Sequence, residues 1–600
     1  MSRASSTRRA GILALPALAA TTVTLGGVAA GAAPTPELIS RAPGGGPPGN
    51  APSAFPTVSA DGRFVAFRSQ ATNLHPDDVD TQHDIFVRDR QTGEVGLVSR
   101  ASGPNGAKGR VASFNPRISA DGRFVAFRSN SNLAPEDTDR IADIYVRDLQ
   151  TQQTILVSRA SGESGEKGNG GSFNPSISAD GRRVAFRSEA TNLHPDDGDA
   201  IFDIYVRDLQ TTETILVSRA AGGAGAKGIG VSQFPVISGD GNRIAFRSGA
   251  PNLHPDDADT IEDIFVRDLG SGETILVSRA AGGGPKGNAR STFASISADG
   301  RRVAFDSLAT NLHPEDPDDR ADVFLHDLDA NQLELVSRAD GAAGAKGSTG
   351  SAEPSISADG RHVAFHSVAT NLDPGDLDPV LDVYIRDLET FDTTLLSGAV
   401  TGEADGRSYE PAISAQGKLV AFHSEADNLS GEDLGASLDV FAVGVAKPPK
   451  CFGKRATAMA AADALTRGTR GRDVIVGSDG DEEVKTGKGR DLVCAGVGDD
   501  VIVTGGGKDT LDAGGGADVV RSGRGRDQVK AGGGADVVGL SRGRDTVKGG
   551  GGADRIKGAR AADTLRGNGG RDLLDGGAGT DTCRGGGGKD RLKRCERGSD

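Results

Sequence analysis

Acidic side chains recur every nine residues in the last part of the chain. From residue 473 to residue 590, each ninth position holds Asp, or Glu at 482, which makes fourteen consecutive acidic positions. Glycine lies two residues before each of them, except for Ala561, and an apolar residue or Cys583 lies two residues after. Ca²⁺ takes about six to eight oxygen ligands, so one short repeat cannot complete a site and neighbouring repeats must share the ion. The spacing therefore predicts a row of calcium sites.

Twelve of these residues are candidate calcium ligands. They are Asp473, Asp491, Asp500, Asp509, Asp518, Asp527, Asp536, Asp545, Asp554, Asp572, Asp581 and Asp590. An alternative is that the carboxylates only make turn hydrogen bonds in a solenoid held by glycine turns and an apolar ladder. Arg or Lys directly precedes several of the carboxylates, and this local positive charge weakens cation binding. Asn or Ser closes a turn equally well, so the use of a carboxylate at all fourteen positions favours calcium.

This region resembles the RTX nonapeptide repeat, G-G-x-G-x-D-x-U-x, over roughly residues 468 to 592. Residues 496–518 match the pattern best, whereas the repeats with Glu482, Ser541, and Ala559 and Ala561 depart from it. The resemblance implies a parallel β-roll with two nonapeptides per turn. It also implies that Ca²⁺ lies between turns, held by the repeat aspartates and turn carbonyls. Because the ion binds the folded roll and not the disordered chain, calcium outside the cell would favour folding after export.

A different repeat precedes this region. The motif V-S-A-D-G-R at 58–63 recurs from residues 118, 177, 237, 296, 356 and 413, at intervals of 57 to 60 residues. In the unit 173–218, turn-forming segments separate four short β-like runs: SIS, RRVAFRS, DIYVRDL and TILVS. Four antiparallel strands repeated seven times predict a seven-bladed β-propeller.

The two ends of the propeller region are complementary. Its last unit ends at residues 438–445 without a fourth strand, while residues 37–40 read as a fourth strand without the three before it. Pairing them would close the ring and remove an exposed edge. The blades resemble TolB-like propeller repeats, related to WD repeats, and this resemblance implies a fold but no particular reaction. We therefore expect an all-β chain: a signal peptide at 1–33, a propeller at 34–446, a linker at 447–467 and a calcium-binding roll at 468–600.

Each blade carries acidic residues in the loop between its second and third strands, spaced D-x-D-x-x-x-D. The sets are Asp78, Asp80 and Asp84; Asp137, Asp139 and Asp143; Asp197, Asp199 and Asp203; Asp257, Asp259 and Asp263; Asp316, Asp318 and Asp322; Asp376, Asp378 and Asp382. Such carboxylates can converge on a hard cation. We favour a structural role instead, in which the last Asp pairs with the Arg of the following S-R-A segment, such as Arg100. The recurrent lysines, such as Lys108, would make ion pairs of little value.

Composition narrows the functional classes. Residues 34–450 contain 38 Lys and Arg against 60 Asp and Glu, so nucleic acid is a poor partner for the propeller. Trp is absent and aromatic residues are 4% of the chain, which disfavours a sugar-binding lectin. The sequence contains no G-x-S-x-G, H-E-x-x-H or P-loop motif.

The first residues read as an export signal. Arg3, Arg8 and Arg9 precede an uncharged stretch that ends in small residues, and no later segment is apolar for long enough to span a membrane. The four cysteines all lie in the last part of the chain, which outside the cell predicts the pairs Cys451–Cys494 and Cys583–Cys595. We expect a secreted monomer.

These patterns predict a non-enzymatic, calcium-binding protein whose propeller binds a protein or small ligand on its long-loop face. One alternative is a hydrolase or lyase with its site in that acidic face, which would depend on residues such as Asp80 and Asp199. A second alternative is a purely structural surface protein, in which both repeats are spacers.

Overall fold

The computed structural model describes residues 36–223, 225–376, 378–398, 404–431, 437–445, 450–452, 454–456, 458–460, 465–477 and 480–599. The predicted export signal lies outside these residues. The chain divides between Pro448 and Pro449 into two compact units, which we describe separately. Within the described residues, no helix is long and apolar enough to cross a membrane.

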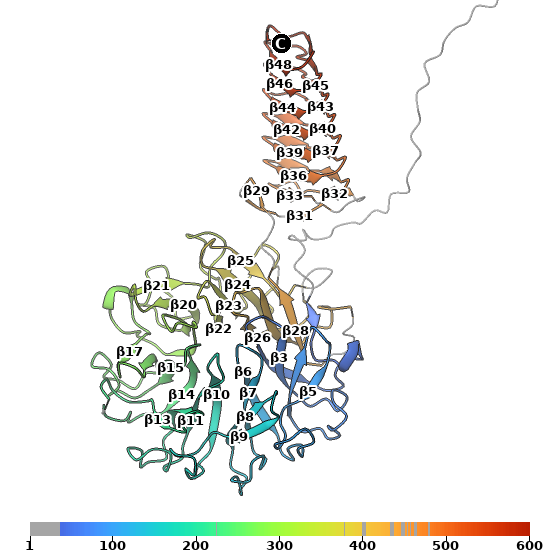
Figure 1. Ribbon diagram of the computed structural model, residues 1–600. Coiled ribbons are helices and arrows are strands. Elements are labelled where there is room, and N and C mark those ends of the chain that lie inside the picture. The colour runs from blue at the N-terminus through green and yellow to red at the C-terminus, as the bar shows by residue number, and fades with distance from the viewer. Residues whose placement is uncertain are drawn as a thin grey trace, which may run out of the picture. The chain divides into compact units, whose positions relative to one another are not determined.

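Six blades of the first unit are four-stranded antiparallel sheets with strands in sequence order (Figure 1). Their strands are as follows: β2 (Ser53–Val58), β3 (Phe64–Ser69), β4 (Asp84–Asp89) and β5 (Val95–Leu97); β6 (Ser113–Ile118), β7 (Phe124–Ser129), β8 (Asp143–Asp148) and β9 (Gln153–Leu156); β10 (Ser172–Ile177), β11 (Arg183–Ser188), β12 (Asp203–Asp208) and β13 (Thr214–Leu216); β14 (Ser232–Ile237), β15 (Arg243–Ser248), β16 (Asp263–Asp268) and β17 (Thr274–Leu276); β18 (Ser291–Ile296), β19 (Arg302–Ser307), β20 (Asp322–Asp327) and β21 (Gln332–Leu335); β22 (Ser351–Ile356), β23 (His362–Ser367), β24 (Asp382–Asp387) and β25 (Thr393–Leu395). Two 3-10 turns, η1 (Pro43–Gly45) and η2 (Ala281–Gly283), lie in loops.

The seventh blade joins the two ends of this unit. It consists of β26 (Ser408–Ile413), β27 (Leu419–Ser424), β28 (Asp439–Gly444) and β1 (Glu37–Leu38), in the order β1-β28-β27-β26. Glu37 is paired with Ala442, and the Ser40 hydroxyl donates to Oδ1 of Asp439 at 2.6 Å. The predicted closure of the ring by the first strand is therefore confirmed.

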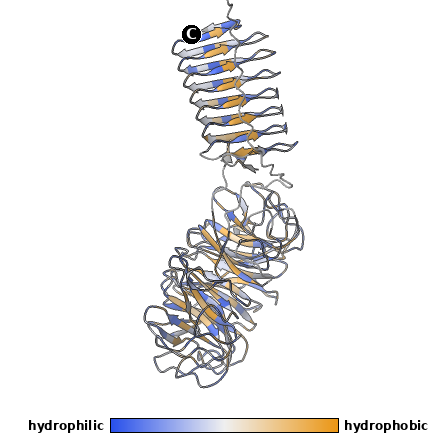
Figure 2. Ribbon diagram, turned by 90° about the vertical axis from the view of Figure 1, so that its right-hand side faces the viewer, coloured by the Kyte–Doolittle hydropathy of each residue, from blue (hydrophilic) through white to orange (hydrophobic). Residues whose placement is uncertain are grey.

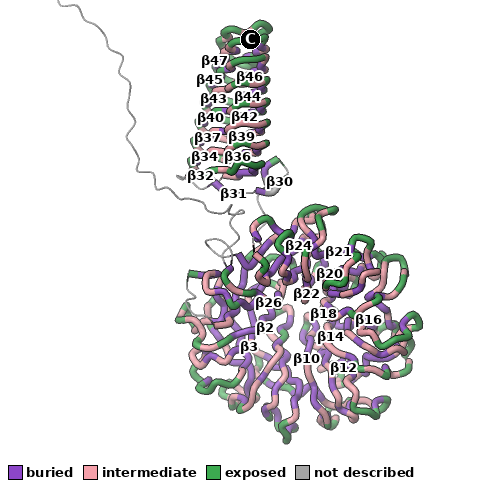
Figure 3. The backbone as a smooth tube through the Cα atoms, turned by 180° about the vertical axis from the view of Figure 1, so that it is seen from behind, coloured by how far each residue is buried: buried purple, intermediate pink, exposed green. Residues whose placement is uncertain are grey.

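Blade packing explains the apolar runs of the middle strands. Each blade has a neighbour on both faces, so the second and third strands are buried on both sides rather than alternately (Figure 3). Phe67, for example, is stacked against Phe86 of the next strand, with ring centroids 6.0 Å apart, and both residues are fully buried. Equivalent pairs recur around the ring, such as Phe127 with Tyr145 and Phe186 with Tyr205.

The A-D-G turns bind the blades to one another on the short-loop side. The N–H of Ala60 donates to the carbonyl of Ala120, Ala120 donates to Ala179, and the series ends where Ala415 donates to Ala60 at 3.1 Å. Gly122 at φ +74° lies against the Phe64 ring of the preceding blade, which leaves no room for a side chain. The repeated motif therefore closes a ring of turns, and the long loops lie on the opposite face.

The second unit is a solenoid, in which short parallel strands are stacked in two main sheets. One sheet contains β31 (Ala458–Met459), β33 (Val474–Val476), β36 (Leu492–Val497), β39 (Thr510–Gly515), β42 (Gln528–Gly533), β44 (Thr546–Gly551), β46 (Thr564–Gly569), β48 (Thr582–Gly587) and β50 (Arg597–Ser599). The other contains β32 (Leu465–Arg467), β34 (Glu483–Lys485), β37 (Val501–Val503), β40 (Val519–Arg521), β43 (Val537–Gly539), β45 (Arg555–Lys557), β47 (Leu573–Asp575) and β49 (Arg591–Lys593). Short strands β35 (Lys488–Gly489), β38 (Gly506–Gly507) and β41 (Arg524–Gly525) pair at the turns, and β29 (Lys450–Cys451) pairs with β30 (Lys454–Arg455).

Strand pairing in the solenoid has an offset of eighteen residues. Val493 is paired with Leu511, and Leu511 with Val529, so two nonapeptides make one turn, as the repeat predicted. The apolar residue of each repeat points inward and forms one continuous core (Figure 2). The first solenoid strands, β31 and β32, lie within the segment 447–467 that we expected to be a linker.

The four cysteines form two disulfide bonds. Cys451 is bonded to Cys494 and Cys583 to Cys595, which confirms the predicted pairing. Cys583 also occupies the interior position of its repeat and is fully buried. The second bond therefore links the end of the core to the final turn.

Candidate functional site

The eighteen-residue offset arranges the acidic residues of the solenoid in two columns. One column contains Asp473, Asp491, Asp509, Asp527, Asp545, Asp563 and Asp581, and the other contains Glu482, Asp500, Asp518, Asp536, Asp554, Asp572 and Asp590. All except Asp590 are at most 4% exposed. Sequence reasoning predicted the repeat of these carboxylates, and the fold places them at equivalent turns, one above another.

One oxygen of each carboxylate is used by the backbone. The N–H of Asp518 donates to Oδ1 of Asp536 at 3.0 Å, and the N–H of Asp536 donates to Oδ1 of Asp554 at 3.1 Å. The same bond joins each successive pair in both columns, from Asp473 with Asp491 to Asp572 with Asp590. The hydrogen-bonding role that the sequence left open is thus present, and it uses Oδ1.

The second oxygen of most of these carboxylates is buried without a hydrogen-bond partner. This holds for Oδ2 of Asp491, Asp518, Asp536, Asp545, Asp554, Asp572, Asp581 and Asp590. Oδ2 of Asp500, Asp509 and Asp527 is buried in the same way, but a polar side chain lies near each of these carboxylates. It is the Glu482 carboxylate for Asp500, the Thr504 hydroxyl for Asp509 and the Ser522 hydroxyl for Asp527. Leaving a buried charged oxygen unsatisfied is costly, so a turn hydrogen bond alone does not explain these residues.

The space beside these oxygens is available only because the residue facing it is glycine. A β-carbon on Gly567 would collide with Oδ2 of Asp572 and would lie 2.6 Å from the carbonyl oxygen of Gly585. A β-carbon on Gly549 would meet Oδ2 of Asp554 and, at 2.9 Å, the carbonyl oxygen of Gly567. Carboxylate and carbonyl oxygens from successive turns therefore face the same point, and these are the ligands that Ca²⁺ prefers. The residues present fit a calcium ion.

Burial raises the pKa of these carboxyl groups. The pKa of Asp500 is raised to about 7, and those of Asp518, Asp545 and Asp554 to about 6. Desolvation is the main cause, and the carboxylates of neighbouring turns add repulsion, as Asp536 and Asp572 do for Asp554. Without a cation, the columns therefore retain protons at a pH where an exposed Asp is ionised.

Asp473 and Asp563 differ from the rest. Oδ2 of Asp473 accepts from the N–H of Thr469 at 2.8 Å, and Oδ2 of Asp563 accepts from the N–H of Ala559 at 3.3 Å. Asp473 is at the beginning of its column, and Asp563 follows the A-R-A-A segment that departs from the repeat pattern. The basic residues before the aspartates, such as Arg490 and Arg526, are exposed, so solvent and salt screen their charge.

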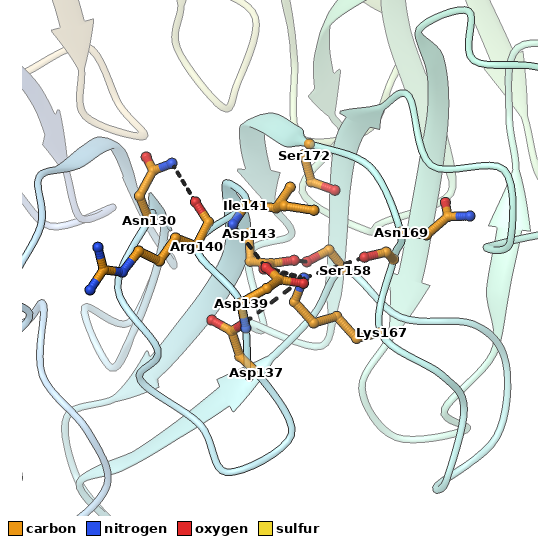
Figure 4. A network of polar contacts seen from close by, with 12 residues as sticks. Asn130, Asp137, Asp139, Arg140, Ile141, Asp143, Ser158, Lys167, Asn169 and Ser172 are labelled. Carbon is orange, nitrogen blue, oxygen red and sulfur yellow. Dashed lines mark hydrogen bonds and ion pairs between the residues drawn. The ribbon is translucent and has the colours of Figure 1, made fainter.

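In the propeller, the acidic loop residues of five blades converge on a lysine. In the second blade, Nζ of Lys167 lies 3.8 Å from Oδ1 of Asp137, 2.9 Å from Oδ2 of Asp139 and 2.9 Å from Oδ2 of Asp143 (Figure 4). Equivalent clusters form around Lys108, Lys227, Lys286 and Lys346. The carboxylate oxygens of each set lie within 4.8 Å of one another, as a metal site would require, but an ammonium group is placed among them.

One sequence-based expectation for these loops is wrong. In five blades the last Asp of the set pairs with the lysine and not with the arginine of S-R-A, and that arginine instead pairs with the residue before the set, as Arg100 does with Asp77 at 3.1 Å. The lysines make the expected ion pairs in largely buried surroundings, since Lys167 is 10% exposed and Asp143 is fully buried. In the sixth blade, Oδ2 of Asp376 accepts from the Tyr384 hydroxyl instead. These facts favour the structural role of the loop carboxylates.

Lys167→Met is expected to destabilise the propeller, because it leaves two buried carboxylates without their cation. We expect a loss of about 2 kcal/mol, below the cost of breaking a fully buried pair because Asp139 is exposed. The measurement is denaturant unfolding of the propeller transition. Arg361→Gln, which removes an exposed pair with Glu389, is the control and should cost less than about 0.5 kcal/mol. Equal effects of the two substitutions would contradict the proposed structural role.

Sequence reasoning missed a set of charged residues beside the propeller axis. The fifth residue of each second strand is Arg68, Arg128, Arg187, Arg247, Asp306, His366 or His423, in blade order. The sequence did contain a signal for this set. The fifth position of the second strand changes from Arg to Asp and His around the ring, whereas the buried Phe before it is repeated in every blade.

Comparison with known proteins agrees with both repeats. The family model of the RTX calcium-binding nonapeptide repeat matches four segments, residues 467–493, 495–529, 530–565 and 558–592. The second unit therefore carries RTX calcium-binding repeats. No curated protein sequence matches the chain.

Several solved propellers are similar to the first unit. TolB from Acinetobacter baumannii is 16% identical, with 60% of this chain and 66% of that chain covered and a TM-score of 0.32. The β-propeller domain of the Trilobed protease from Pyrococcus furiosus is 14% identical, with 66% and 93% covered and a TM-score of 0.38. Oligogalacturonate lyase from Vibrio parahaemolyticus is 11% identical, with 69% and 92% covered and a TM-score of 0.39.

Proposed function

We propose that this chain is an exported, non-enzymatic calcium-binding protein, in which the RTX solenoid is stabilised by Ca²⁺ and the propeller binds a ligand or partner. The buried Oδ2 atoms of the aspartate columns are the observation that carries the calcium proposal. In bound form, Ca²⁺ would supply positive charge between the turns. The side chains of eleven of the twelve candidates, all except Asp473, together with turn carbonyls, would hold it.

Export is supported by the same features. Extracellular calcium is abundant enough to occupy weak sites, and disulfides such as Cys583–Cys595 persist in oxidising compartments. The ion would bind the folded solenoid and not the unfolded chain, so calcium outside the cell would shift the solenoid toward its folded form. Nothing in this proposal requires the solenoid to act on a substrate.

The binding role of the propeller rests on its long-loop face. The connections between second and third strands and those between blades both lie on that face, and long loops on a rigid scaffold commonly carry binding sites. Asp80 and Asp199, on which a hydrolase or lyase would depend, are held by Lys108 and Lys227. This arrangement supports a binding platform rather than a catalytic site in those loops.

The stability of the solenoid is expected to depend on pH in opposite ways with and without calcium. The pKa of Asp554 is about 6 in the fold, above its ordinary value of 3.8, so the folded state binds more protons than the unfolded chain. Without calcium, stability should therefore be highest near about pH 4 and fall as the pH rises through about 6 to 7. With millimolar calcium, ionised carboxylates bind the metal, and stability should rise over the same range.

Calorimetric unfolding of the full chain, with chelator and with calcium, tests this prediction and the calcium proposal together. The transition of the solenoid should move in opposite directions between about pH 5 and pH 8 in the two conditions. An identical pH dependence in chelator and calcium would exclude the aspartate columns as the metal site. The transition of the propeller serves as the internal control.

A further inference from the structure

The side chains around the propeller axis form an uneven ring. The first strands of neighbouring blades pack against one another around the axis, and the second strands lie next to them (Figure 1). Arg68 is opposite Ala54, Arg128 is opposite Phe114, and Arg187 is opposite Phe173. Each arginine directly precedes the last residue of its strand, such as Ser69, after which the long loop begins. The ring therefore lies near the long-loop end of the axis.

A bulge in the first strand of each blade shapes this region. The pairing register shifts between residues 114 and 117 in the second blade, and at the equivalent place in the others. Residues at positive φ occupy these bulges, and they include Phe55, Phe234, Glu353 and Glu410. A bulge re-aims side chains, and strained non-glycine residues are concentrated at functional sites. The repeated strain is therefore consistent with a binding region on the axis.

Arginines and phenylalanines alternate through the first four blades. We call this set the guanidinium–aromatic belt: Phe55, Arg68, Phe114, Arg128, Phe173, Arg187, Phe234 and Arg247. The Arg68 guanidinium is 4.4 Å from the Phe55 ring centroid and 5.5 Å from that of Phe114, and Arg128 is 4.3 Å from Phe114 and 5.1 Å from Phe173. Ring faces hold the guanidinium planes while leaving their N–H edges available.

The belt has few anionic partners of its own. Within the described residues, no carboxylate lies within 4.0 Å of the guanidinium of Arg68, Arg128 or Arg187, and only Arg247 has one, Glu262 at 3.4 Å. Gln233 accepts from both Arg187 and Arg247, at 2.9 and 3.0 Å. The Nε atoms of Arg128 and Arg187 are buried without an acceptor. Burial lowers the pKa of these arginines, a cost that an incoming anion would offset.

Acidic groups of the remaining blades offset part of this positive charge, because Glu410 attracts Arg68 and Asp306 attracts Arg247, whereas Arg128 has no such acidic neighbour. Asp306, Glu353 and Glu410 lie on that side, with His366 and His423, and Nδ1 of His366 is 3.7 Å from Oε2 of Glu353. Burial and the neighbouring acids raise the pKa of Glu353 to about 8, and burial raises that of Glu410 to about 7, so Glu353 is mostly protonated at neutral pH. The histidines are neutral there, because burial lowers their pKa.

The belt is accessible to solvent. Arg68, Arg128, Arg187 and Arg247 are each partly exposed, as are the rings of Phe55, Phe114, Phe173 and Phe234. Arg117, on the first strand of the second blade, is exposed. Solvent therefore reaches part of each of these side chains.

We propose that the guanidinium–aromatic belt binds a small ligand that bears oxyanions, either carboxylate or phosphate, with Arg68, Arg128 and Arg187 as its main contacts. The proposal deepens the binding role proposed for the propeller and is independent of the calcium site. Guanidinium groups form paired, charge-assisted hydrogen bonds with both kinds of oxyanion.

Calorimetric titration of the full chain in calcium-free buffer with succinate, and separately with inorganic phosphate, tests the proposal. We expect saturable binding of at least one probe with one site per chain, and the stronger probe identifies the oxyanion class. Arg128→Gln should weaken binding at least about tenfold by removing a charged contact, whereas Arg128→Lys should retain more of it. Arg301→Gln, at an exposed turn on the short-loop side, should leave binding unchanged.

Saturable binding of neither probe, or binding that Arg128→Gln and Arg187→Gln both leave unchanged, would overturn the proposal. The propeller unfolding transition of each variant shows whether it has folded, and Arg128→Lys retains the charge if the Gln variant does not fold. Calcium uptake is measured on the same variants in separate samples that contain neither probe. A chain that takes up calcium but binds neither anion would contradict the belt proposal alone. A chain that binds an anion but takes up no calcium would contradict the calcium proposal alone.

Discussion

Gly532→Ala is expected to disrupt the solenoid, whereas Gly533→Ala beside it should be tolerated. Gly532 has φ +119°, and a β-carbon there would lie well inside contact distance of the Gly514 carbonyl oxygen in the preceding turn. At Gly533 a β-carbon would meet nothing within 4 Å. Backbone strain and overpacking together should cost about 4 kcal/mol at Gly532.

Denaturant unfolding of the solenoid transition in calcium measures this difference. The two substitutions make the same chemical change at adjacent residues of β42, so they are closely matched. A similar loss of stability in both variants would contradict a specific role for the close approach of the turns at Gly532, because Ala at an unstrained position lowers the entropy of the unfolded chain and should not destabilise the fold.

Replacing three aspartates of one column should abolish most of the calcium-dependent stabilisation. In Asp518→Asn, Asp536→Asn, Asp554→Asn, each side chain keeps its size and its Oδ1 acceptor, so the backbone hydrogen bonds are retained. Each site lost removes about 2.7 kcal/mol when calcium is at one hundred times its Kd, and three lost sites would remove about 8 kcal/mol. The calcium-induced shift of the solenoid transition should fall accordingly.

Glu483→Gln is the matched control for this variant. Its carboxylate lies in the same solenoid but is 45% exposed and pairs with Lys485. The control should retain the full calcium shift. In chelator, the triple variant should be at least as stable as the unmodified protein, because it lacks three repelling buried carboxyl groups. A triple variant with an undiminished calcium shift would show that the metal binds elsewhere.

Much of the fold could be predicted because both repeats are periodic. The A-D-G-R spacing identified the blades, and the unmatched strand at residues 37–40 identified how the ring closes, which β1 and β28 confirm. The resemblance to the RTX repeat implied the turn of eighteen residues, and the strand pairing confirms it. In both cases one local pattern is repeated often enough to exclude other architectures.

The partners of individual side chains were less predictable. Asp143 pairs with Lys167, twenty-four residues away, because the loop between β9 and β10 folds back over the second blade, and the sequence contained an equally plausible arginine nearby. The belt was missed for a related reason. Arg68 and Phe114 lie in different blades and meet because neighbouring blades pack together. Contacts between repeats depend on curvature, which the spacing within one repeat does not specify.

Amide hydrogen exchange of the full chain, with calcium and with excess chelator, tests the central claim most directly. If calcium held by the aspartate columns stabilises the solenoid, peptides from residues 480–592 should be protected in calcium and exchange rapidly in chelator, while propeller peptides are unchanged. Equal protection of the solenoid peptides in both conditions would contradict the account.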